Sequence, residues 1–187
     1  ELVLPDSLVT IGNSVFSGCK KLTSVTLSNS VVNYGSSVFG SCTALTQVTF
    51  GGNMASVPMQ MFSGCTALES IVIPDGVTTI CKEAFKDCKA LTSVTIPDSV
   101  KTIEDGAFKG CIKLATIHLP TTLTSLGEEV FSGCSVLNNV VIPTGITLIN
   151  ERLFYNCKAL TSVTLHGGIT YVGYQAFYAC SALAELS

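Results

Sequence analysis

A repeat of 23 residues runs through the chain and constrains its fold more than any other feature. Three residue types recur at that interval without insertion or deletion, and one unit reads approximately L-T-S-V-T-I-P-D-S-V-T-T-I-G-x-x-A-F-x-G-C-x-x. Phenylalanine stands at 16, 39, 62, 85, 108, 131, 154 and 177, cysteine at 19, 42, 65, 88, 111, 134, 157 and 180, and leucine at 22, 45, 68, 91, 114, 137, 160 and 183. An unbroken period of this length is typical of a solenoid of stacked coils.

A single unit is too short to fold alone. Each inward side chain contributes roughly 1.5–3 kcal/mol when buried, whereas fixing each backbone residue costs roughly 1–2 kcal/mol. The burial within one unit therefore does not offset its loss of backbone entropy. Stacking of coils supplies the missing stabilisation because it buries both faces of each coil and pairs its strand with neighbouring strands. Residues at the same position of successive coils then form a column in which each side chain has the same surroundings, so phenylalanine should lie on phenylalanine. We therefore expect residues 1–187 to form one domain of about eight coils, taken from a longer array.

The order of elements within a unit is clearest in residues 91–111. Val94 and Ile96 should point one way and Ser93 and Thr95 the other, which is the alternation of a strand. Proline ends this strand in five units, and a second extended piece, such as 77–80, follows the turn. A helical turn carrying Ala84 and Phe85 comes next. The pattern predicts an α/β repeat solenoid, curved and right-handed, with one parallel sheet on the concave face and short extended or helical turns on the convex face.

The columns L-x-x-V-x-I-P, V-T-x-I-G, A-F and G-C resemble the 23-residue leucine-rich repeat of BspA-like surface proteins from bacteria and parasitic protists. The match is clearest in ALTSVTIPDSVKTIEDGAFKGC, residues 90–111, and extends over the whole chain. The resemblance implies a cell-surface or secreted location and adhesion to extracellular matrix or host cells. It implies no catalytic motif. Ser28, Gly51 and His166 replace the proline in three units, which suggests irregular turns along one rim.

The cysteine column has two interpretations. Disulfides between coils require a particular geometry that would disturb the even spacing, and zinc sites require closely spaced cysteine or histidine pairs that this sequence lacks. We favour small buried thiols that each fill a tight corner of a coil. Cys81 lies outside the column, beside Lys82 and Glu83, where it could be exposed and reactive.

No arrangement of residues predicts catalysis, a metal site or a cofactor. His118 and His166 fall in different columns two coils apart, and the acidic pairs at 104–105 and 128–129 fit a solvated edge better than acid–base chemistry. The sequence shows no Lys/Arg stripe, which argues against nucleic-acid binding. No apolar run approaches the roughly 20 residues of a membrane span, so we expect no membrane insertion by this segment.

Two outward columns of the predicted concave sheet are the best candidates for a binding site. Their side chains are mostly short and uncharged, and such side chains lose little conformational entropy on contact with a protein or glycan. Serine and threonine also suit exposed strands without any binding role, and an ice-binding threonine lattice fits poorly with a curved sheet. The candidate residues are Gln47, Ser70, Val72, Ser93, Thr95, Thr116, His118, Asn139, Val141, Ser162 and Thr164.

These observations favour a non-enzymatic binding or adhesion module that holds a protein, a host-matrix ligand or a glycan on the concave sheet. The alternative is a structural spacer or self-assembling array, since both ends carry ordinary repeat residues on which coils of another molecule could stack. Residues 22–68 contain no charged side chain, so this quarter of the chain could also form a contact surface.

Overall fold

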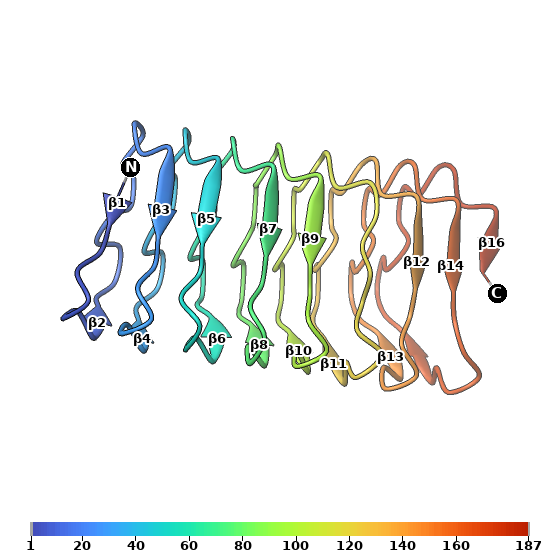
Figure 1. The fold of residues 1–187 in the computed structure, drawn as a ribbon. Helices are drawn as coiled ribbons and strands as arrows, with labels where there is room; N and C mark the ends of the chain where they lie inside the picture. Colours follow the sequence, from blue (N-terminus) through green and yellow to red (C-terminus); the bar gives the residue numbers. More distant parts are fainter. Residues whose placement is uncertain (1, 187) are drawn as a thin grey trace.

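Most coils contain two short strands followed by a turn that leads to the next coil, and the coils build an elongated stack (Figure 1). The computed structural model describes residues 2–186. The first strand of each coil belongs to the strand face, formed by β1 (Leu2–Val3), β3 (Ser24–Thr26), β5 (Gln47–Thr49), β7 (Ser70–Val72), β9 (Ser93–Thr95), β12 (Asn139–Val141), β14 (Ser162–Thr164) and β16 (Glu185–Leu186). The second strands are β2 (Thr10–Ile11), β4 (Asn33–Tyr34), β6 (Ser56–Val57), β8 (Thr79–Ile80), β10 (Thr102–Ile103), β11 (Ser125–Leu126), β13 (Leu148–Ile149) and β15 (Tyr171–Val172).

All strand pairs are parallel and join residues one repeat apart. Ser24 pairs with Gln47 and Val25 with Val48 in the strand face, and Thr79 pairs with Thr102 on the second-strand side. The 23-residue period therefore sets the strand register, as the sequence predicts.

The single continuous sheet predicted from the sequence is wrong. The strand face is divided into β1-β3-β5, β7-β9 and β12-β14-β16, and the second strands into β2-β4, β6-β8-β10-β11 and β13-β15. Residues 116–119 form no strand and contribute an isolated bridge between Thr116 and Asn139. The two lines of strands are interrupted mostly at different junctions, so neither line is continuous along the stack.

The phenylalanine turn is the continuous element of the stack. At each of the seven junctions between successive phenylalanine turns, three N–H groups of one coil donate to carbonyl oxygens of the next at 2.7–3.1 Å. In one coil these donors are Glu83, Phe85 and Asp87, which bond to residues 105, 107 and 109. The N–H groups between them bond locally, as when Lys86 donates to the Glu83 oxygen at 3.1 Å. Along each phenylalanine turn, one N–H group therefore bonds to the next coil and the following N–H group closes a turn within its own coil.

This alternation explains why the predicted helical turn is wrong. Residues 2–186 contain no helix, and the segment around Ala84 and Phe85 is a series of turns. Glu83 and Asp87 have φ angles of 55° and 56°, in the left-handed region, so a right-handed helix cannot pass through them. Their amides point toward the next coil instead of toward the preceding helical turn. The fold is a parallel β-solenoid, and the α/β class is corrected accordingly.

The core is a set of apolar columns parallel to the long axis. Six phenylalanine side chains, from Phe39 to Phe154, are fully buried, and rings of successive coils stack with centroids 5.4–6.1 Å apart and planes within 14° of parallel. Cysteine and leucine columns pack beside the rings, and Leu91 and Leu114 are fully buried. The expected stacking of phenylalanine on phenylalanine is confirmed.

Candidate binding face

The residues proposed for ligand binding all lie on the strand face. Alternation within each strand turns the middle residue inward and its two neighbours outward. In β7, for example, Ile71 is 3% exposed, whereas Val72 is 65% exposed. Ten of the eleven candidate side chains are exposed, and Ser162 is half-buried. The alternation thus predicts their orientation correctly, while their role in binding stays a prediction.

A first hollow lies where the strand face is interrupted between β5 and β7. It has a volume of about 360 Å³ and is lined by residues of both strands, including the predicted residues Gln47, Ser70 and Val72. The N–H of Phe50 has no acceptor among the described residues, whereas the equivalent N–H of Leu27 donates to the Thr49 oxygen at 2.8 Å. The break in the backbone ladder and the hollow therefore occur at the same junction.

A second hollow lies between residues 116–119 and β12. Its volume is about 170 Å³, and four predicted residues line it: Thr116, His118, Asn139 and Val141. Thr121 contributes to its rim.

The sequence did not predict the apolar wall of this second hollow, which Ile117, Leu119 and Pro143 complete. The Leu119 N–H finds no acceptor within residues 2–186, while the equivalent N–H of Ile142 donates to Thr164. This apolar wall lies beside the imidazole of His118 and the carboxamide of Asn139, an arrangement that suits a ligand side chain with an apolar body and a polar end.

The remaining candidates, Ser93, Thr95, Ser162 and Thr164, lie outside both hollows.

The cysteine column forms a ladder of thiol hydrogen bonds. All nine cysteines are free. Each column thiol from Cys42 to Cys180 donates to the carbonyl oxygen of the phenylalanine 26 residues earlier, at 3.0–3.2 Å. Burial raises the pKa of the Cys65 and Cys134 thiols to about 12. The prediction of small buried thiols is confirmed for six column cysteines, whereas Cys19 is exposed and Cys180 is half-buried. The sequence did not predict the thiol hydrogen bond, for which the constant Phe–Cys spacing was the available signal.

Cys81 has few of the properties of a reactive thiol. Its side chain is half-buried, and burial, followed by the neighbouring Glu104 carboxylate, raises the pKa of the thiol. A reactive cysteine needs a lowered pKa and good access. Its surroundings therefore disfavour the thiolate.

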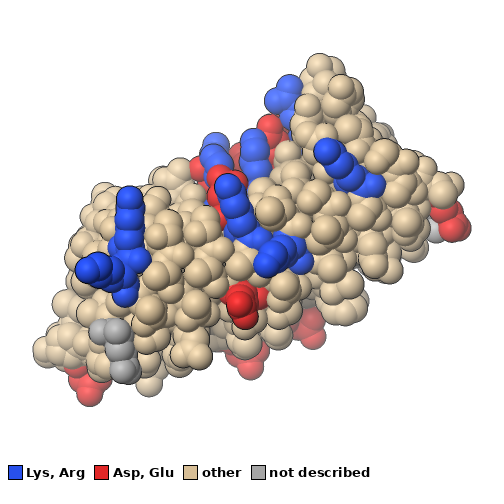
Figure 2. Space-filling view, turned by 90° about the horizontal axis from the view of Figure 1, so that it is seen from above, with Lys and Arg blue, Asp and Glu red and all other residues tan. Residues whose placement is uncertain are grey.

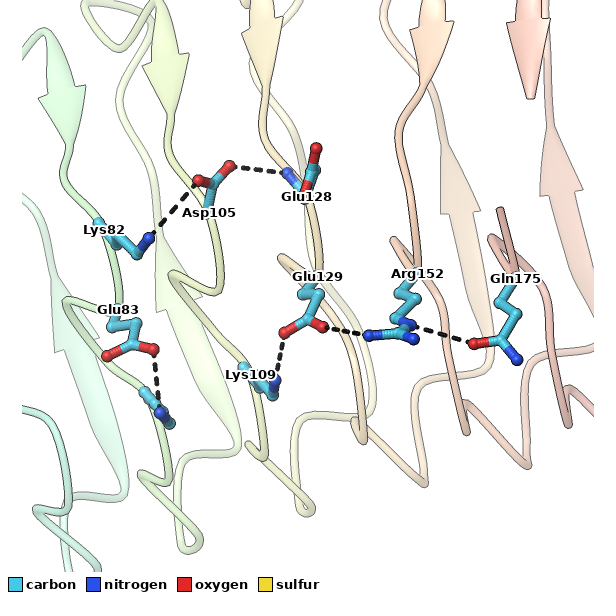
Figure 3. Close-up of polar contacts among 9 residues, drawn as sticks. Lys82, Glu83, Asp105, Lys109, Glu128, Glu129, Arg152 and Gln175 are labelled. Atoms are coloured by element: carbon cyan, nitrogen blue, oxygen red, sulfur yellow. Dashed lines mark hydrogen bonds and ion pairs between the residues drawn. The ribbon is translucent and has the colours of Figure 1, made fainter. Parts of the chain in front are cut away.

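Three of the four carboxylates in the acidic pairs predicted as solvated edges make contacts between coils, and Figure 3 shows two of them, Asp105 and Glu129, whereas the Glu128 side chain is exposed. Glu104 accepts the Lys82 N–H at 2.8 Å, and Asp105 accepts the Glu128 N–H at 2.9 Å. Glu129 binds both Lys109 and Arg152, and the Lys109 hydrogen bond is the largest influence that lowers the pKa of its carboxyl group. These carboxylates are engaged in contacts between coils.

Two further kinds of site were sought in the described part of the chain, a metal-ion site and a membrane span. Across residues 2–186, no three His, Cys, Asp or Glu side chains are grouped so that they could hold a metal ion. The same residues include no helix of the length and hydropathy needed to cross a bilayer.

A profile of the BspA type leucine-rich repeat region, present in six copies, matches residues 1–115 and 55–184. The chain belongs to the BspA-type leucine-rich-repeat family. This assignment confirms the resemblance seen in residues 90–111. Families of this type are generally non-enzymatic.

Solved structures of other bacterial leucine-rich repeat proteins share the fold. A leucine-rich repeat protein from Bacteroides ovatus has a TM-score of 0.75 and 26% identity over 96% of this chain. The T. pallidum leucine-rich repeat protein has a TM-score of 0.69 and 26% identity over 98% of the chain. A leucine-rich cell surface protein from Faecalibacterium prausnitzii has a TM-score of 0.61 and 27% identity over 96%.

This BspA-type chain is shorter than those proteins. It spans 58% of the B. ovatus chain, 78% of the T. pallidum chain and 64% of the F. prausnitzii chain. The sequence matches no curated protein.

Proposed function

We propose that this chain is a non-enzymatic binding module of a cell-surface or secreted protein and that it holds a protein ligand on its strand face. The second hollow is the observation that carries the proposal. It joins Thr116, His118, Asn139 and Val141 in one recess with an apolar wall. The likeness to a protein described as a leucine-rich cell surface protein supports the location.

The chemistry of the hollow favours a protein partner over a soluble substrate. Val141 presents 65% of its surface to solvent, so contact with an apolar group would remove this area from water. His118 and Asn139 supply hydrogen-bonding groups beside it. A host-matrix protein offers side chains of both kinds, whereas a glycan would find no Phe, Tyr or Trp ring among the residues that line this recess.

The test is a binding assay against immobilised matrix proteins and host-cell surfaces. The parent chain is compared with Val141→Lys and His118→Lys, which fill the hollow with a charged side chain, and with Met59→Lys, an exposed position on the phenylalanine turns. We expect at least tenfold weaker binding for the two hollow variants, unchanged binding for Met59→Lys and similar melting temperatures for all. Equal binding by all four proteins would exclude the hollow as the site.

Failure of the folded parent to bind any protein surface would overturn the binding role. Light scattering over a range of concentrations then tests the alternative, in which coils of separate molecules stack end to end as a spacer or array. Oligomers that grow with concentration would support that alternative.

A further inference from the structure

Seven of the ten Lys and Arg residues lie along one edge of the stack. They occupy the positions one, four and five residues after the phenylalanines, so a spacing of 23 residues brings them into neighbouring columns. Figure 2 looks down on this edge and shows the basic side chains distributed along it. We call this set the basic edge: Lys20, Lys21, Lys86, Lys89, Lys109, Lys113 and Lys158.

Most of the charge on the basic edge is uncompensated. Lys86 pairs with Glu83 at 2.9 Å, and Lys109 pairs with Glu129. The other five lysines are exposed and form no ion pair among residues 2–186. Asp87 is the one acidic residue within the five positions that follow any phenylalanine. The edge is therefore positive although the chain has a net charge of −3.

The opposite edge has the opposite sign. Asp6, Asp75 and Asp98 occupy the turns that follow the first strands, and all three are exposed. Lys101 also lies there, with its Nζ 3.3 Å from the Asp98 carbonyl oxygen, so the acidic side chains outnumber the basic one. The lysines of the basic edge and these aspartates thus lie at opposite ends of each coil. Such separation orients an anionic partner toward one edge and repels it from the other.

The unpaired lysines form a line with a modest charge density. They belong to coils one, four, five and seven, and coils joined by parallel strands are about 4.8 Å apart. Successive positions along the edge are therefore separated by roughly 5–15 Å. Duplex DNA carries one charge per roughly 1.7 Å, which is much denser than this line. A single linear polymer with well-spaced anionic groups fits it better.

Two tyrosines lie on the same edge, Tyr155 in the coil of Lys158 and Tyr178 in the next coil. Tyr155 and Tyr178 occupy the column of Lys86 and Lys109, and their rings stack with centroids 5.0 Å apart. Tyr178 is 53% exposed. Exposed aromatic rings offer apolar contact area with a phenolic hydroxyl beside it, which suits the mixed apolar and polar surface of a sugar.

We propose that the basic edge binds a linear anionic glycan, with carboxylate or sulfate groups on Lys89, Lys113 and Lys158 and a sugar ring at Tyr178. This site is separate from the strand-face hollow and does not depend on its function. The two sites leave room for a glycan and a protein on the same module.

The test uses heparin as a sulfated glycan and neutral dextran as its uncharged control. The variant Lys89→Ser/Lys113→Ser is compared with Lys82→Ser/Lys101→Ser, which changes the net charge by the same amount away from the edge. We expect the edge variant to bind heparin at least tenfold more weakly. The slope of the logarithm of the binding constant against the logarithm of the salt concentration should also become smaller by about two units. The control variant should change affinity less than twofold.

Other outcomes would overturn the proposal. Equal weakening by both lysine pairs would show that net charge alone attracts heparin. Tighter binding of a short duplex DNA, or of vesicles containing phosphatidylserine, at the same salt concentration would identify a different class of partner. Tyr178→Ala should also weaken heparin binding, while the parent and all variants should retain the same circular-dichroism spectrum.

Discussion

The Sγ atom of Cys111 donates a hydrogen bond to the carbonyl oxygen of Phe85 at 3.2 Å, and this bond links two coils. The same oxygen also accepts the N–H of Cys88 within its own coil, at 3.2 Å. One carbonyl therefore closes a turn and holds the next coil. This double use gives a physical reason for the constant distance between phenylalanine and cysteine.

The thiol ladder should make the protein sensitive to alkaline pH. Burial raises the pKa of the Cys134 thiol to about 12, whereas an unfolded cysteine titrates near roughly 8.5. Between these values the native state binds more protons than the unfolded state, so stability falls as pH rises, by about 1.4 kcal/mol per pH unit for each such thiol. Urea unfolding at pH 7 to 10.5 measures this slope.

The variant Cys111→Ala tests the same idea at one position. Loss of the thiol hydrogen bond and its packing should cost about 1–2 kcal/mol at pH 7. Above pH 9, however, the variant should lose stability more slowly than the parent because one buried thiol no longer ionises on unfolding. Parallel slopes for the two proteins would contradict a raised pKa of Cys111.

The cysteines should react with a thiol reagent in a fixed order. Cys19 is exposed and should react first. Cys81 and Cys180, which are partly buried, should follow slowly, because burial is the largest cause that raises the pKa of each thiol. The six buried thiols should react after denaturation, when all nine become available without reductant. Mass spectrometry of the labelled protein at successive times gives the order, and early labelling of Cys111 would contradict the structure.

Left-handed backbone at Asp87 predicts an unusual response to substitution. Its φ angle is 56°, and the equivalent positions in the adjacent coils are Gly64 and Gly110, each with a φ angle of 75°. Asp87→Gly should leave the free energy of unfolding unchanged or raise it by up to about 1 kcal/mol, whereas Asp87→Val should lower it by about 1–2 kcal/mol or more. Lys89→Val, two residues later and outside the left-handed region, is the control and should change stability little.

Hydrogen exchange should separate the continuous turn ladder from the interrupted strand face. The amide of Phe62 donates to the Ala84 oxygen at 2.9 Å, while that of Phe50 has no acceptor among the described residues. We expect the amides of Phe50 and Leu119 to exchange much faster than those of Phe62 and Phe108 under native conditions. The Ile73 amide, bonded to Thr95 at 3.0 Å, serves as the strand-face reference. Equal protection of all five would mean that the breaks close in solution.

The sequence predicted those features that depend on repetition alone. The period fixed the register of paired strands such as β8 and β10, and the alternation in Ser93-Val94-Thr95 predicted which side chains face outward. The interruption at Thr116-Ile117-His118 could not be predicted, because these residues show the same alternation and differ only in how their backbone meets the neighbouring coils. The apolar wall of the second hollow was missed for that reason.

The predicted helical turn failed for a related reason. Ala84 and Phe85 are compatible with a helix, and Glu83 is not glycine; Gly106 is the one glycine among the eight residues of its column that marks the left-handed position. The amide pattern that replaces the helix exists only when another coil supplies carbonyl oxygens. The expectation that the chain has no Lys/Arg stripe is likewise wrong, because lysines that are dispersed in sequence align along the basic edge once they are placed in their columns.

The continuous turn ladder has a mechanical consequence. Force applied along the axis must break three turn hydrogen bonds at every junction, whereas bending away from the turns separates coils at the interruptions that already exist between β5 and β7 and around residues 116–119. The molecule should therefore resist extension more strongly than flexure. A ligand seated in a strand-face hollow would bridge such an interruption and raise the bending stiffness of the rod.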